Sequence, residues 1–313
     1  MRRLLTMIFT VTLGVGCSTD REPGDLFGSI EEDVLVIDAT LIVDQPLPHI
    51  FVRRTANPRV LYDPTSLGVV DAVVIVTSDG QQWEYLASPD SVGQYLPPTP
   101  TPVVEPTTTY RLDVRVAGHI ATGVTTTPER LKLARTVLLD EETLVVVAEL
   151  VPFSMGAERS FTAPENQLIY RDGLIEMQLT GPVGGSLAYQ LSLSGLDRDS
   201  DFVIDADFLE DEDYEDFDRE GASPPLQFDE DRARFPWFAV AFEGRHVLRL
   251  FAVDENWYDF IRTNLTDDGG GFGGLAGDAF ERPIFRLEGA IGLFGSASAD
   301  SVGVVILPRP DGD

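Results

Sequence analysis

Apolar and polar residues alternate with a period of two along much of the chain, which is typical of strands that bury one face. The first segments with this pattern span residues 33–43, 49–55, 71–87 and 108–128. Asp79-Gly80 supplies the positive φ that a tight hairpin turn needs, and Ala117-Gly118 marks a second hairpin. Strands at this spacing predict an immunoglobulin-like or prealbumin-like β-sandwich over residues 32–128.

The strand pattern continues beyond this first unit. Residues 129–160 form a connecting β segment with an acidic turn, and residues 161–308 contain further strand-like runs separated by glycine-containing turns. The predicted fold class is therefore all-β. The first sandwich is followed by a second β-rich domain, which we expect to be sandwich or barrel-like, with one short helix.

That helix is expected near residues 255–265, in the segment DENWYDFIRTNL. Asp254 is a natural N-cap, Glu255 suits the positive end of the helix, and Val253 with Tyr258 would form a hydrophobic staple. The face that we expect to be buried repeats at helical spacing and consists of Trp257, Ile261 and Leu265.

The N-terminus has the layout of a bacterial lipoprotein signal. Two arginines precede an apolar stretch that is too short to cross a bilayer and ends LGVGC at Cys17. Residues 1–16 are thus predicted to be a signal peptide, Cys17 the lipidated residue, and residues 17–31 a flexible tether. An ordinary secretory signal with an incidental cysteine would not explain why the one cysteine of the chain falls at the cleavage point. We expect a protein that is held to a membrane by lipid on Cys17 and does not span it. The motif leaves both the periplasmic and the surface-exposed leaflet open.

The charge of the chain limits its partners. It has 52 acidic and 23 basic residues, a formal net charge of −29, and such a surface repels phosphate backbones, so no nucleic acid is expected as a partner. Lys132 is the only lysine. Codon bias in a GC-rich genome and adaptation to concentrated salt both explain this composition, and the sequence leaves the two open.

The chain resembles a lipoprotein family of Bacteroidota-type bacteria catalogued as domain of unknown function 4249. The resemblance rests on the segments LVIDATLIVDQPLPHIFVRRTA, VVDAVVIVTSDGQQWEYLASPDSVGQY and TTYRLDVRVAGHIATGVTTTP, and on NWYDFIRTN followed by EGAIGLFGSASADS. It implies an outer-membrane lipoprotein, with a TonB-dependent outer-membrane receptor as a possible partner in nutrient uptake. The family provides no catalytic residues to carry over.

The acidic stretch at 195–220 suggests one metal site. Asp197, Asp199 and Asp201 have the spacing of the first calcium ligands in an EF-hand-like loop. Phe202 and Phe208 occupy the positions where such a loop needs glycine and a bidentate glutamate. A strand over 201–209 with one wet face, followed by an acidic loop over 210–220, explains the same spacing, so calcium is the minor alternative and no other cofactor is expected.

Other motifs point away from classical catalysis. The glycines at 269, 271 and 274 fit a phosphate-loop pattern, but they follow a helix and predict a surface loop. His49, His119 and His246 are far apart in sequence, and core packing is expected for the tryptophans at 83, 237 and 257. No catalytic residue is assigned. The leading hypothesis is a non-catalytic binding or accessory lipoprotein of the cell envelope; the alternatives are a carboxylate-dependent hydrolase with a cleft in the C-terminal domain and a structural surface protein.

Overall fold

The computed structural model describes most of the chain between residues 33 and 308. The described residues are 33–56, 63, 65–140, 142–150, 152–153, 166–169, 173–203, 219–225, 231–236, 242–263 and 283–308. Several predicted features lie outside these residues: the signal peptide, Cys17, the tether, the glycine run, Trp237 and the greater part of the acidic stretch. No helix of the described part is long and apolar enough to cross a membrane.

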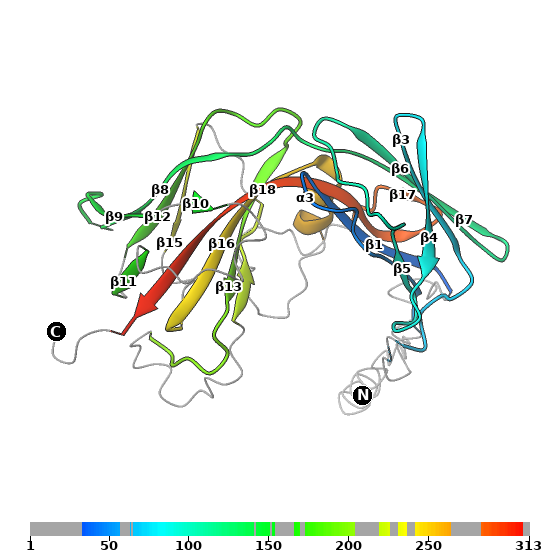
Figure 1. Cartoon of the computed structure of the whole chain (residues 1–313), viewed down its shortest axis with the longest axis horizontal. Helices are drawn as coiled ribbons and strands as arrows, with labels where there is room; N and C mark the ends of the chain where they lie inside the picture. The colour runs from blue at the N-terminus through cyan, green and yellow to red at the C-terminus, as the bar shows by residue number, and fades with distance from the viewer. Residues whose placement is uncertain are drawn as a thin grey trace, which may run out of the picture.

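The described residues are mainly strands, which confirms the all-β prediction (Figure 1). They form two hydrogen-bonded sheets, and each of two large apolar clusters lies between facing layers of strands. For the C-terminal part, the arrangement found is a sandwich, one of the two that the sequence suggested. Alternating burial along the strands produces both cores, since every second side chain points inward.

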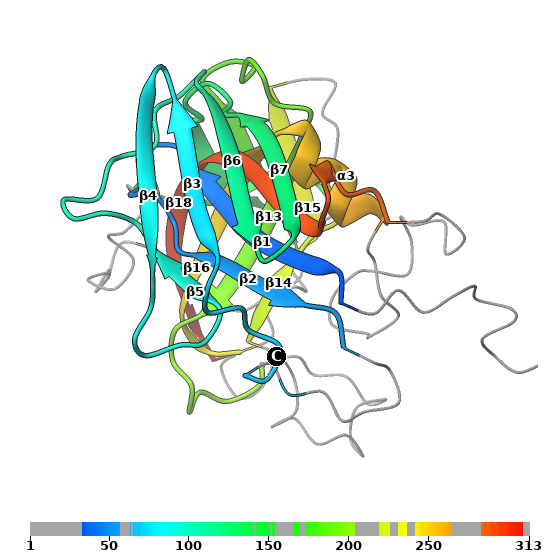
Figure 2. The same cartoon turned by 90° about the vertical axis from the view of Figure 1, so that its right-hand side faces the viewer.

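The first sandwich faces two layers against each other (Figure 2). One layer has the strands β1 (Leu35–Ile42), β2 (Ile50–Arg54) and β5 (Gln94–Leu96). The other layer has β4 (Gln81–Ala87), β3 (Val73–Ser78), β6 (Thr109–Val116), β7 (His119–Thr126) and the short β17 (Leu287–Glu288). Both expected hairpins are present: β3 and β4 turn at Asp79-Gly80, where φ is 47° and 77°, and β6 and β7 turn at Ala117-Gly118.

The second sandwich packs a four-stranded sheet on the remaining strands. The four strands, in spatial order, are β15 (Arg232–Pro236), β12 (Leu174–Leu179), β8 (Leu133–Leu139) and β9 (Val146–Leu150). The facing layer has β14 (Glu220–Ala222), β13 (Ala188–Gly195), β16 (Gly244–Val253) and β18 (Ile291–Leu307), with β10 (Pro152–Phe153) and β11 (Gln167–Ile169) also paired to β18.

The long strand β18 connects the two sandwiches. Its first part runs parallel to β1, from Val36 opposite Ile291 to Ile42 opposite Ala297, and its later part runs antiparallel to β16. Phe294, which is 2% exposed, lies in the first core, whereas Val302 and Val304 lie in the second. The first and last strands of the fold are therefore neighbours, and one continuous sheet crosses the joint between the sandwiches (Figure 1).

Candidate functional site at the joint of the sandwiches

The helix α3 (Glu255–Thr263) lies where the two sandwiches meet (Figure 1). Its start is the one that the sequence predicts. The Trp257 amide donates a hydrogen bond to Asp254 Oδ1 at 2.9 Å, which makes Asp254 the N-cap, and Glu255 is in the first turn. Val253 and Tyr258 belong to one small apolar cluster, as expected for a hydrophobic staple.

The fully buried residues of α3 are polar, whereas the described part of the predicted apolar face is only half-buried. The buried helix residues are Asn256, Asp259 and Thr263, while Trp257 and Ile261 are only half-buried and Leu265 lies outside the described residues. The cause is the surface that the helix meets. That surface presents backbone carbonyl and amide groups and an arginine, and these need polar partners once they are removed from water.

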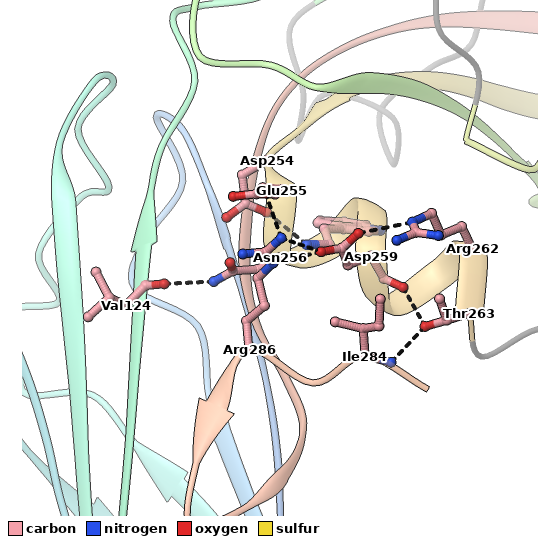
Figure 3. A network of polar contacts seen from close by, with 10 residues as sticks. Val124, Asp254, Glu255, Asn256, Asp259, Arg262, Thr263, Ile284 and Arg286 are labelled. Atoms are coloured by element: carbon pink, nitrogen blue, oxygen red, sulfur yellow. Dashed lines mark hydrogen bonds and ion pairs between the residues drawn. The ribbon is translucent and has the colours of Figure 1, made fainter. Parts of the chain in front are cut away.

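Asn256 connects the helix to both sides of the first sandwich (Figure 3). Its Nδ2 amide donates to the Val124 carbonyl of β7 at 2.7 Å and to the Phe294 carbonyl of β18 at 2.8 Å. An amide NH₂ has two protons, so one side chain satisfies both carbonyls. The helix is thus fixed to two strands that are remote from each other in sequence.

The second turn of α3 holds the chain segment that leads into β17 (Figure 3). Asp259, whose side chain is 6% exposed, pairs with Arg286 at 2.5 Å and with Arg262 at 2.9 Å. Thr263 Oγ1 accepts a hydrogen bond from the Ile284 amide at 2.9 Å. Charged groups removed from water in this way remain stable because they are paired and hydrogen-bonded.

Asp254 also contacts the first sandwich directly, and it is 4% exposed. The Thr125 hydroxyl of β7 contacts Asp254 Oδ2 and lies 2.8 Å from the Ser296 hydroxyl of β18. Burial raises the pKa of the Asp254 carboxyl, and hydrogen bonds from Thr125 and the Trp257 amide oppose that rise in part. This carboxyl is enclosed by protein groups, so it interacts with residues of the joint and not with a molecule in solvent.

The candidate calcium ligands are placed differently from a metal loop. The Asp197 carboxylate is held by Arg245, with Oδ1 at 2.5 Å from Nη2 and Oδ2 accepting the Arg245 backbone amide at 2.7 Å. The hydrogen bonds from Arg245 lower the pKa of Asp197. Asp199 and Asp201 are exposed, and the described residues contain no group of three acidic, histidine or cysteine side chains that could hold a metal ion.

The strand expected over residues 201–209 is described only at its start. Phe202 forms an isolated bridge with Phe242, and the two rings meet edge to face at 5.5 Å. Arg219 lies over the Phe242 ring at 3.9 Å and donates to the Ser200 carbonyl at 3.0 Å. The turn at residues 197–201 is therefore supported by two arginines, Arg219 and Arg245.

The structure does not bring the histidines together. His49 and His119 are exposed, and His246 is 1% exposed, with its Nδ1 3.1 Å from the Gly244 carbonyl. Burial lowers the pKa of His246. The tryptophans pack as expected where they are described: Trp83 stacks on Tyr110 in the first core, and Trp257 contacts Phe251 at the joint.

Sequence reasoning missed the residues that complete the joint, namely Thr125, Ser296, Asn256 and Arg286. The alternation in β7 does place Thr125 on an inward face, which is unusual for a hydroxyl residue, and this is the feature that could have indicated it. Its partners lie more than a hundred residues away in the chain, at Asp254 and Ser296. No local pattern could identify them.

Comparison with known proteins gives the chain a family. No curated protein matches the sequence. The family model described as a domain of unknown function, DUF4249, matches residues 25–302, a range that includes β1, α3 and most of β18. The chain therefore belongs to the DUF4249 family.

Proposed function

We propose that this protein is a lipid-anchored protein of the outer membrane that binds another protein and catalyses no reaction. The anchor follows from the short apolar N-terminal stretch ending LGVGC at Cys17. The binding role is supported best by one surface feature, the exposed apolar edge strand β9.

The two residues before β9 and its first two residues are apolar and exposed to solvent. Leu144, Val145, Val146 and Val147 are 45%, 62%, 43% and 41% exposed. The stretch from Thr143 to Ala148 carries no charge, in a chain whose net charge is −29. Four consecutive exposed aliphatic residues are rare on a surface that meets only water.

The backbone of β9 is also suited to a partner. It is the last strand of the four-stranded sheet and pairs with β8, and none of the other described strands pairs with its opposite edge. An extended segment of another protein can add to such an edge through main-chain hydrogen bonds and bury the valine side chains. β9 lies at the end of the molecule far from α3 (Figure 1), so a partner there would not disturb the joint. We propose a TonB-dependent outer-membrane transporter as the partner.

Anchoring is tested by replacing the proposed lipidated residue. In cells grown with labelled palmitate, the wild type is expected to carry the label and sediment with membranes. Cys17→Ser should lose the label and appear in the soluble fraction. Retention of both properties by Cys17→Ser would overturn the anchor.

Binding is tested with a matched pair of surface variants. Val145→Arg places a charge immediately before β9, whereas Ile120→Arg places the same charge on β7, where Ile120 is 64% exposed. After gentle solubilisation, the tagged wild type and Ile120→Arg should co-purify with a transporter, and Val145→Arg should lose it. Recovery of all three proteins alone in repeated preparations would count against the proposed partner.

A further inference from the structure

We propose that Asp254 is a proton-binding site in the joint, and that the protonated carboxyl holds α3 more tightly to the first sandwich than the ionised one does. This inference concerns the joint and does not depend on the function proposed for β9. It starts from the partners of the carboxyl, which come from three separate parts of the fold.

Each partner of Asp254 suits a carboxyl in either protonation state. Oδ1 accepts the Trp257 amide at 2.9 Å, and this bond needs no charge on the acid. Oδ2 meets the Thr125 hydroxyl, which in turn lies 2.8 Å from the Ser296 hydroxyl. A hydroxyl both donates and accepts, so the direction of this chain can reverse. With the acid ionised, Thr125 donates to Asp254, and Ser296 donates to Thr125 or to the carboxylate itself. With the acid protonated, Asp254 donates to Thr125 and Thr125 donates to Ser296.

Proton uptake therefore breaks no hydrogen bond in the chain of hydroxyls. It does remove a negative charge from an enclosed site, and charge is the costly form in such a site. Thr125 and Ser296 are 2% and 0% exposed, so water does not replace the solvation that the carboxylate has lost. The neutral acid is the form that this surrounding favours.

The charged groups nearest to the site belong to α3 and the segment before β17. Glu255 follows Asp254 and is exposed, and Asp259 lies one turn further on; both pair with Arg286. The residues of β7 and β18 that flank the hydroxyls, Val124 and Thr126, and Gly295 and Ala297, carry no charge. Among the described residues, no arginine or lysine forms an ion pair with Asp254 itself.

The direction of the linkage follows from the raised pKa of Asp254. A group whose pKa is higher in the folded state contributes stability that is fully present below its unfolded pKa and is lost as the pH rises through the folded value. The joint should therefore become tighter on mild acidification. The Asp197 carboxylate acts in the opposite direction, since its ion pair with Arg245 lowers its pKa.

The test follows the carboxyl and the joint separately. The NMR chemical shift of the Asp254 side-chain carboxyl carbon is followed as a function of pH in the whole protein. Its signal is assigned by its absence in Asp254→Asn. Hydrogen-exchange protection of the Trp257 amide, corrected for the intrinsic pH dependence of exchange, is measured over the same range. We expect a midpoint above the ordinary carboxyl range, with protection of Trp257 increasing severalfold as the carboxyl takes up its proton.

Two variants complete the experiment. Asp254→Asn keeps an acceptor for Trp257 and a donor for Thr125, so it should show high protection with no such rise at low pH. Asp38→Asn removes a second carboxyl of raised pKa, on β1, and should keep the wild-type response. An ordinary midpoint for Asp254 in the wild type, or a raised midpoint with unchanged protection at Trp257, would overturn the proposal.

Discussion

Replacing Asn256 by aspartate tests whether the polar face of α3 holds the joint together. The change is nearly isosteric, but an ionised carboxylate accepts hydrogen bonds only. The two bonds that Asn256 donates, at 2.7 Å to the Val124 carbonyl and 2.8 Å to the Phe294 carbonyl, would be replaced by contacts between oxygens. Leaving a buried polar group unsatisfied costs about 1–3 kcal/mol each, or about 2–6 kcal/mol for both carbonyls.

One favourable effect opposes this loss. A negative charge in the first turn of a helix is stabilising by about 0.3–1 kcal/mol. We therefore expect Asn256→Asp to lower the free energy of unfolding by about 1–6 kcal/mol at neutral pH, from the combined estimates above. Asn256 is 9% exposed, so water offers the two carbonyls little compensation.

The measurement is urea unfolding at pH 7, followed by tryptophan fluorescence and extrapolated to water. Gln82→Glu adds the same charge at an exposed position on β4 and should stay within about 0.5 kcal/mol of the wild type. The role given to Asn256 would be refuted if the free energy of unfolding of Asn256→Asp also remained within about 1 kcal/mol of the wild type. Such a change is smaller than the cost of two unsatisfied carbonyls, even at the low end of about 2 kcal/mol.

Three further predictions concern other parts of the fold. Gly292 has φ +106°, and an added Cβ would lie 2.1 Å from the Ile37 carbonyl oxygen, so Gly292→Ala should lower the melting temperature. Gly221 has open space around it, so Gly221→Ala should leave the melting temperature unchanged. Equal shifts of the two variants in calorimetry would contradict this reasoning. Arg245→Ala should raise the pKa of Asp197 toward its ordinary value, so this variant should lose less stability than the wild type when the pH falls through the carboxyl range. If the free energy of unfolding in urea depended on pH identically in both proteins, this pairing would be excluded. Calcium titrated into chelated protein should release no heat beyond dilution if the ion pair with Arg245 occupies the first turn of the acidic stretch, and saturable heat would restore the calcium hypothesis.

The local features of the chain were predictable because they depend on neighbours in sequence. The alternation of apolar and polar residues identified β1, β3, β6 and β7. Asp79-Gly80 identified a turn, and both residues have the positive φ that such a turn needs. The N-cap Asp254 was found for the same reason, since capping involves residues only three positions apart.

The buried face of α3 was not predictable by the same rule. Periodicity marks Trp257 and Ile261 as a core face, yet the helix packs on a surface of strand carbonyls and an arginine, which demands Asn256 and Asp259 instead. An apolar stripe indicates burial only when the surface it meets is apolar, and that surface is made by β7, β18 and the segment before β17. These are distant in the chain, and their arrangement is not encoded locally.

The class of fold, the hairpins, the start of the helix and the resemblance to DUF4249 were all predictable from the sequence, because each depends on short-range order or on direct similarity. The three-dimensional fold was needed to show that β18 and β1, the last and first of the described strands, lie side by side and that β18 contributes to both cores. Strand pairing over such separations is selected by the total burial and hydrogen bonding of the whole sheet. No single segment of the sequence therefore shows which distant strand it will pair with. The same long-range choice places Thr125, Asp254 and Ser296 in contact, and with them the proton-binding site of the joint.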